Sequence, residues 1–265
     1  MSILGAGRIL PFGSRHSVHI LERNRLIFRR GWMLIFSGFF EPLFYLLGIG
    51  FGLGSLIGSV EGPGGQTIPY AVFVAPGLLA ASAMNGAVYD STNMFFRLRY
   101  EKSYDGMLAT PMSVGDIALG EVAWALMRGT LYAIGFLVVM FALGLMSSPL
   151  GLLALPASML IGFATAAVGL TAVSFMRSWQ DLDLFFVATL PLFLFSATFF
   201  PIGAYPEPLR IVVELSPLYR GVDLIRGLTT GVVGVSQLID VIYLALMGAF
   251  FLWFASRRLG HMLLK

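Results

Sequence analysis

The sequence of 265 residues is 57% hydrophobic and only 12% charged, whereas soluble domains carry about 25% charged residues. This balance, with a mean hydropathy of +0.84, excludes an ordinary soluble protein and predicts an all-α integral membrane protein. The chain has no cysteine, which excludes disulfides and thiolate metal sites. Its net charge of +3 is interpreted as a topological signal rather than as a nucleic-acid-binding surface.

Residues 1–30 are expected to form a cytoplasmic tail before a single membrane domain over 31–265. Segment 14–30 combines apolar residues at helical spacing with a basic face, which predicts an amphipathic helix lying on the membrane. The equally open alternative is an ordinary cytoplasmic segment before the first span, whose arginine side chains extend to the lipid headgroups. The residues concerned are Val18, Leu21 and Phe28 on the apolar side, and Arg15, Arg23, Arg25, Arg29 and Arg30 on the basic side.

Six apolar segments approach the roughly 20 residues needed to cross about 30 Å of hydrocarbon. They are 31–57, 69–96, 122–146, 150–176, 184–200 and 238–256. Thirteen Lys and Arg residues then fall on the side of the two termini, and only Arg210, Arg220 and Arg226 on the other. Because basic residues accumulate in cytoplasmic loops, both termini are expected in the cytoplasm.

Three ionisable residues, Glu41, Asp90 and Arg128, lie within these segments at similar depths. Each would cost about 2.5–3.5 kcal/mol at a helix centre, so we expect them to pair. Three alternatives remain for these residues. They could form a structural ion pair, or they could belong to a gate at the cytoplasmic side. In the third alternative, the Arg128 side chain extends to the lipid headgroups.

The loop between the second and third segments is too polar to cross a membrane. Its Tyr104, Met107 and Leu108 stand at i, i+3 and i+4, which predicts a short helix with an apolar patch, and Pro111 ends it. Such a patch in a polar rim suits a protein interface, although it could also rest on the bilayer. The rest of the rim and the next loop on this side, 176–183, add further candidates: Tyr100, Glu101, Lys102, Asp105, Thr110, Arg177, Trp179 and Asp181.

The segment after the fifth span contains four prolines, at 201, 206, 208 and 217, which predict short helices instead of one continuous helix. In the second of these helices Leu218, Val222, Ile225 and Leu228 share a face. This pattern suits a helix in the outer membrane interface. The other candidate residues of this helix are Tyr219, Arg220, Asp223 and Arg226.

Aromatic residues are abundant, with 23 phenylalanines. Most should face lipid or pack between helices, but two groups could line an apolar groove that accepts sugar rings, planar drugs or acyl chains. These are Phe39, Phe40, Phe44 and Tyr45 on the first span, and Phe185, Phe186, Phe193 and Phe195 on the fifth.

The sequence has no GxxxxGK[ST] nucleotide-binding loop, no HExxH and no GxSxG motif. The chain is therefore expected to hydrolyse no ATP and to hold no metal or other cofactor. It is either one subunit of a pump or a passive or scaffolding protein.

Three stretches carry a family resemblance. "EPLFYLLGIGFGLGSLIG" (41–58), "GDIALGEVAWALMRG" (115–129) and "LSPLYRGVDLIRGLTTG" (215–231) resemble the permeases of type-2 ABC exporters, most closely the NodJ-type lipo-oligosaccharide export permeases. The resemblance covers nearly the whole chain.

The resemblance implies a permease dimer in a bacterial-type inner membrane, docked on two cytoplasmic ATPase subunits, which bind ATP and Mg. The loop between spans two and three would be the coupling helix that contacts the ATPase, and re-entrant helices between spans five and six would cap the exit. A lipid-linked saccharide, glycolipid or polysaccharide is the implied substrate, while a related branch exports hydrophobic drugs. A stand-alone carrier or a membrane scaffold without an ATPase is the alternative from another class.

Overall fold

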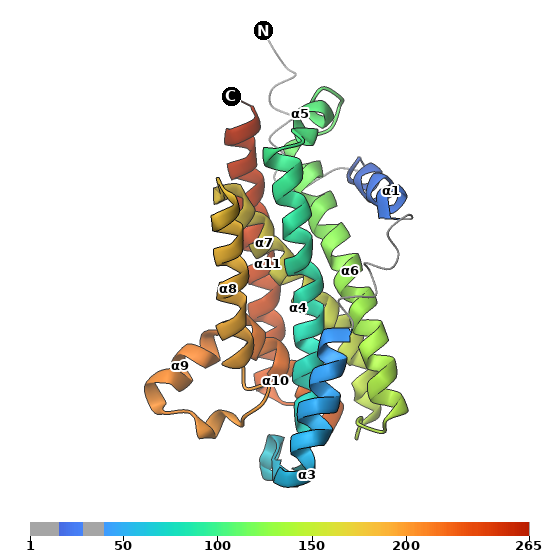
Figure 1. The fold of residues 1–265 in the computed structure, drawn as a ribbon, viewed down its shortest axis with the longest axis vertical. Helices are drawn as coiled ribbons and strands as arrows, with labels where there is room; N and C mark the ends of the chain where they lie inside the picture. The colour runs from blue at the N-terminus through green and yellow to red at the C-terminus, as the bar shows by residue number, and fades with distance from the viewer. Residues whose placement is uncertain (1–15, 29–39, 265) are drawn as a thin grey trace.

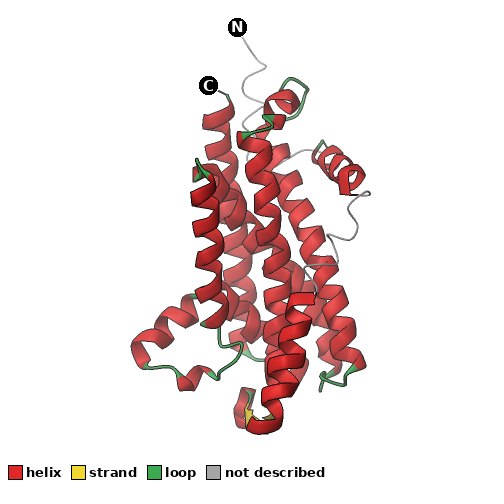
Figure 2. Ribbon diagram, in the orientation of Figure 1, coloured by secondary structure: helices red, strands yellow, loops and turns green. Residues whose placement is uncertain are grey.

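The computed structural model describes residues 16–28 and 40–264. Long helices run side by side in one bundle (Figure 1), and helices dominate this part of the chain, with only two short strands (Figure 2). The short helix α5 (Ser103–Leu108) and the C-terminal end of α11 (Val235–Leu263) lie at one end of the bundle, here called the α5 end. Helix α3 (Gly54–Ile57) and α10 (Pro217–Thr230) lie at the other, the α10 end.

The remaining elements follow in chain order. They are α1 (Ser17–Phe28), the π-helix η2 (Leu46–Leu53), the antiparallel strands β1 (Ser59–Glu61) and β2 (Thr67–Pro69), the 3-10 turn η3 (Pro63–Gly65) between the strands, α4 (Tyr70–Arg99), α6 (Val114–Ala142), η4 (Pro149–Leu153), α7 (Ala154–Phe175), α8 (Trp179–Leu194), η5 (Ile202–Ala204) and α9 (Glu207–Leu215).

Five helical segments of the described chain are long and apolar enough to cross a membrane: Phe40–Ile57, Tyr70–Arg99, Val114–Ala142, Pro149–Phe175 and Val235–Leu263. The first begins where the described residues resume, so 31–39 of the expected first span lie outside them. The expected fifth span corresponds to α8, which has 16 residues. At about 1.5 Å per residue α8 falls short of a hydrocarbon core of about 30 Å. The all-α membrane fold is confirmed, and the sixth span stays a prediction.

Helix α6 begins earlier than the sequence pattern predicted. Ser113 accepts a hydrogen bond from the backbone N–H of Asp116, and the Asp116 carboxylate accepts one from the N–H of Ser113. This capping box starts the helix at Val114. The polar stretch 114–121, assigned to a loop, is therefore the first part of α6.

Helix α4 is the centre of the bundle, with 89% of its most apolar window buried. It packs against α6, α7, α10 and η2. At its crossing with α6, a Cβ added to Gly86 would stand 2.5 Å from Cα of Gly129. The two backbones touch there, as small residues allow between membrane helices.

Helix α10 is inserted into the bundle, where it packs against α4, α7 and α11. The expected apolar face is present, because Leu218, Val222, Ile225 and Leu228 are all buried. The position of α10 relative to the membrane interface, which the same pattern suits, stays a prediction. Helix α9 projects sideways at the α10 end (Figure 1).

Candidate functional site

Four buried or half-buried charges of alternating sign run between α4 and α6. Helix α4 supplies Asp90 and Arg97, and α6 supplies Glu121 and Arg128. Each pair is seven residues apart, about two helical turns, so its members share one face. Arg97 Nη2 lies 2.5 Å from Glu121 Oε2 and 3.9 Å from Asp90 Oδ2, and Arg128 Nη1 lies 3.3 Å from Asp90 Oδ1. We call Glu121, Arg97, Asp90 and Arg128 the charge ladder.

The ladder is desolvated. The side chains of Asp90 and Glu121 are 0% exposed and that of Arg97 is 6% exposed. Buried ions cost several kcal/mol each unless partners compensate them, and two neutral groups add to the ion pairs. Asn93 donates to Asp90 over 2.9 Å, and Asn24 of α1 accepts from Arg97 over 3.3 Å.

Tyr104 of α5 packs against the Glu121–Arg97 end of the ladder. Its side chain is 1% exposed and its hydroxyl adjoins Glu121 and Arg97. Burial, followed by the charge of Glu121, raises the pKa of Tyr104 well above its usual value, so it is a neutral phenol. Tyr104 and Leu108 are thus turned into the bundle. The exposed patch expected from Tyr104, Met107 and Leu108 is wrong, because only Met107 is partly accessible.

Helix α1 packs against α6. Ile20 and Asn24 are buried, and a Cβ on Gly120 would stand 2.7 Å from Cδ1 of Ile20. Arg23 lies 3.9 Å from Glu101, before α5. On the expected apolar side, Val18 is half exposed and Leu21 is partly buried, and the contact of this side with a membrane stays a prediction. Arg15, Arg29 and Arg30, predicted for the basic side, and the side chain of Phe28 lie outside the residues that the structure describes.

The two loops expected on one side of the membrane meet at the α5 end. The rings of Phe96 and Trp179 lie 4.7 Å apart, and Tyr100 lies 6.2 Å from Trp179. Tyr100 and Trp179 are exposed, and exposed polar or charged residues surround them. We call this combined area the α5 surface. It comprises Tyr100, Glu101, Lys102, Asp105, Thr110, Pro111, Arg177, Trp179 and Asp181.

Only part of the expected intramembrane cluster forms. Arg128 pairs with Asp90, as one alternative predicted. Glu41 instead is exposed and accepts a hydrogen bond of 2.9 Å from Tyr89. The three-residue cluster of Glu41, Asp90 and Arg128 is therefore wrong in its Glu41 member, and Arg97 and Glu121 complete the group.

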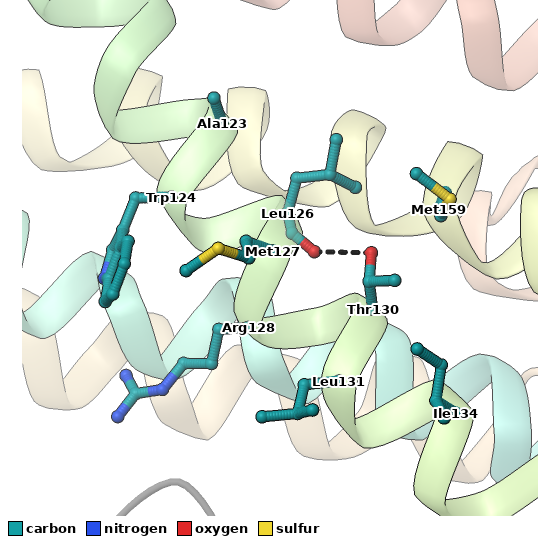
Figure 3. A pocket seen from close by; sticks show the side chains of 9 residues that line it. All are labelled: Ala123, Trp124, Leu126, Met127, Arg128, Thr130, Leu131, Ile134 and Met159. Carbon is teal, nitrogen blue, oxygen red and sulfur yellow. Dashed lines mark hydrogen bonds between the residues drawn. The ribbon is translucent and has the colours of Figure 1, made fainter. Parts of the chain in front are cut away.

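A pocket of about 450 Å³ opens on the face of α6 and α7, with Arg128 at its edge (Figure 3). The hydroxyl of Thr130 donates to the backbone oxygen of Leu126, which leaves the walls mainly apolar. The lining residues are Ala123, Trp124, Leu126, Met127, Arg128, Thr130, Leu131, Ile134 and Met159.

None of the aromatic residues expected to line a groove lines this pocket. Tyr45 packs on Phe193 at 5.6 Å, which joins the two predicted groups. Phe40 stacks on Phe44, and Phe44 and Phe195 are exposed. Phe185 and Phe186 are partly buried and in contact, and Phe39 lies outside the described residues.

Charged residues of α10 anchor it at the expected exit. Arg220 pairs with Asp240 of α11 at 3.2 Å, and Asp223 accepts hydrogen bonds from Ser236 and Gln237. Arg226, expected on a polar face, is buried and donates to the backbone oxygens of Phe73 and Ala197. Tyr219 is half-buried. In residues 16–28 and 40–264 no group of three or more His, Cys, Asp or Glu could hold a metal.

Residues 17–229 match the family described as ABC-2 type transporter. The chain belongs to the ABC-2 type transporter family. It is 32% identical over 249 residues to nodulation protein J of Rhizobium leguminosarum bv. trifolii, covering 92% of this chain and 93% of that protein. Nodulation protein J of Sinorhizobium fredii is 31% identical over 222 residues, 82% of each chain. Members of this family are transmembrane transport subunits whose ATPase is a separate subunit.

Sequence reasoning missed two members of the charge ladder of this ABC-2 permease, and also Asn24, which accepts a hydrogen bond from Arg97. Arg97 and Glu121 were assigned to the polar loop between the second and third spans. The seven-residue spacing from Asp90 to Arg97 and from Glu121 to Arg128 was the signal that could have revealed them, because it places opposite charges face to face on antiparallel helices.

Proposed function

We propose that this chain is the permease subunit of an ATP-driven exporter that moves a lipid-linked saccharide, glycolipid or polysaccharide out of the cytoplasm. The family match over residues 17–229 carries the proposal. The sequence has no nucleotide-binding loop of its own, so ATP and Mg are bound by two cytoplasmic ATPase subunits.

The α5 surface is the proposed ATPase contact. Two exposed aromatic residues, Tyr100 and Trp179, lie within a polar rim, which is the composition of a protein interface with a few strong anchors. Tyr104, buried inside the chain, does not belong to this contact. The excess of basic residues on this side supports a cytoplasmic position for the α5 end and both termini.

A second permease copy or homologue is proposed to cover α8. Only Leu182 of this helix is buried, and an apolar row remains exposed at Leu184, Val187, Leu190 and Leu194. Lipid alone could cover such a row, but α8 is shorter than a span, and protein contact would shield the non-helical chain after it, which lipid cannot satisfy.

The relatives named nodulation protein J support a saccharide with a lipid part as the substrate. The contact between Tyr45 and Phe193 is consistent with an aromatic wall beside α8, because aromatic faces stack on sugar rings. Export of a hydrophobic drug by the same kind of machine is the second candidate. A stand-alone carrier or scaffold is the candidate that needs no ATPase.

Co-purification with a candidate ABC ATPase expressed together with this chain tests the proposal. Tyr100→Ser with Trp179→Ser should lower recovery of the ATPase about tenfold or more, because two anchors of the interface are lost. Phe200→Ser, which changes an exposed aromatic near the other end of the bundle, should leave recovery unchanged. A folded wild-type chain that retains no ATPase would contradict the proposal.

A further inference from the structure

The charge ladder joins two features that otherwise lie apart. At one end Tyr104 of α5 adjoins Glu121 and Arg97. At the other end Arg128 lines the pocket on α6 and α7 (Figure 3). The three links, at 2.5, 3.9 and 3.3 Å, run between these ends without interruption. A movement of α5 therefore has a continuous path of charged contacts to the pocket.

The ladder has two possible pairings. Arg97 is bonded to Glu121 and lies 3.9 Å from Oδ2 of Asp90. Within the described residues, that Oδ2, Oε1 of Glu121 and Nε of Arg97 are buried and make no hydrogen bond of good geometry, with Trp124 beside Asp90 and Tyr104 beside Glu121. A small displacement of Arg97 toward Asp90 would satisfy one carboxylate at the expense of the other. Because an unpaired buried charge is costly, each carboxylate favours the position of Arg97 closer to itself, and Arg97 lies within reach of both.

We propose that the charge ladder is a two-position switch in which Arg97 shifts between Glu121 and Asp90 and so couples α5 to the Arg128 pocket. The inference rests on the proposed function, since the partner ATPase is what moves α5. Arg97 is a positioning residue in this scheme. Tyr104 and Asn24 hold its two sides, one from α5 and one from α1.

The absence of cysteine from the chain permits a test that needs no transported substrate. An environment-sensitive fluorophore is placed at Gly106→Cys on α5, where a Cβ meets nothing within 4 Å, or at Met127→Cys in the pocket, which is 48% exposed. The labelled chain is assembled with its ATPase, and the change in fluorescence on adding Mg-ATP is measured at each position.

With the native ladder, both labels should respond to Mg-ATP. Asp90→Asn and Glu121→Gln each remove one of the two alternative partners of Arg97. Each should preserve the response at Gly106→Cys and reduce that at Met127→Cys by about fivefold or more, the range of typical coupling between sites. Equal responses at Met127→Cys in the native and the variant ladders would overturn the switch.

Tyr104→Phe keeps all four charges of the ladder, and it is the variant to use if Asp90→Asn and Glu121→Gln fail to fold. It should also reduce the response in the pocket, whereas Tyr243→Phe, which removes a hydroxyl that donates to Leu215 far from the ladder, should not. Identical behaviour of these two variants would overturn the proposal. If the ATPase does not bind the labelled chain, or if it binds and Mg-ATP still changes no fluorescence at Gly106→Cys, the result would count against the proposed function.

Discussion

Asp90 lies between two arginines, with Arg128 at 3.3 Å and Arg97 at 3.9 Å, and its side chain is 0% exposed. Neutralising one arginine leaves the carboxylate with the other arginine and Asn93 as its remaining partners. The cost of burying Asp90 is therefore shared between residues of α4 and α6, and substitutions at this position should not act independently.

Arg128→Gln should lower the free energy of unfolding by about 3 kcal/mol, since a buried charge loses its partner. Combined with Asp90→Asn, the loss should be smaller than the sum of the two single losses. Thermal unfolding of the purified protein in detergent measures the cycle. Arg210 and Glu214 form an exposed i,i+4 pair at 2.8 Å and supply the control cycle, in which little coupling is expected. Strict additivity for Asp90 and Arg128 would mean that their contact contributes nothing.

At the level of helices, the crossing of α4 and α6 sets the geometry of the ladder. Gly86 and Gly129 let the two backbones touch, which brings Asp90 and Arg128 within reach of each other. A larger residue at the crossing would separate the helices and lengthen the ion pairs.

Gly129→Ala should destabilise the fold by about 1–3 kcal/mol. The new Cβ would stand 2.7 Å from the backbone oxygen of Ala83, and neither helix backbone can move away without disturbing its packing. Gly260→Ala on α11 is the matched control, since its Cβ meets nothing within 4 Å, and it should be neutral or slightly stabilising. Melting temperatures in the same detergent compare the two. If Gly129→Ala and Gly260→Ala have the same melting temperature, the close crossing is not important for stability.

The helices themselves were predictable from hydropathy, because five of the six expected apolar segments correspond to long apolar helices. The start of α6 was not, since the capping box of Ser113 and Asp116 lies in a stretch whose average polarity suggested a loop. The inward direction of Tyr104 was also missed. Periodicity shows that Tyr104 and Leu108 share a face, but not whether that face meets the bundle or a partner.

For the whole molecule, hydropathy could not decide how α8 and α10 are placed. Helix α10 has the alternating faces of a surface helix, yet its charged side meets Asp240, Ser236 and Gln237 of α11 and it sits inside the bundle. Helix α8 is apolar but short, with one buried residue. Its proposed neighbour is a second chain, and a single sequence contains no direct information about such a contact.

Reconstitution into vesicles tests most directly the claim that this chain is the permease of an ATP-driven exporter. The purified chain and its ATPase are inserted together, and a fluorescent lipid-linked oligosaccharide is followed from one leaflet to the other with a membrane-impermeant quencher. The probe should cross only with Mg-ATP and both subunits, and not when the phosphate-binding lysine of the ATPase is replaced by alanine. An equal rate without ATP, or with this chain alone, would contradict the account.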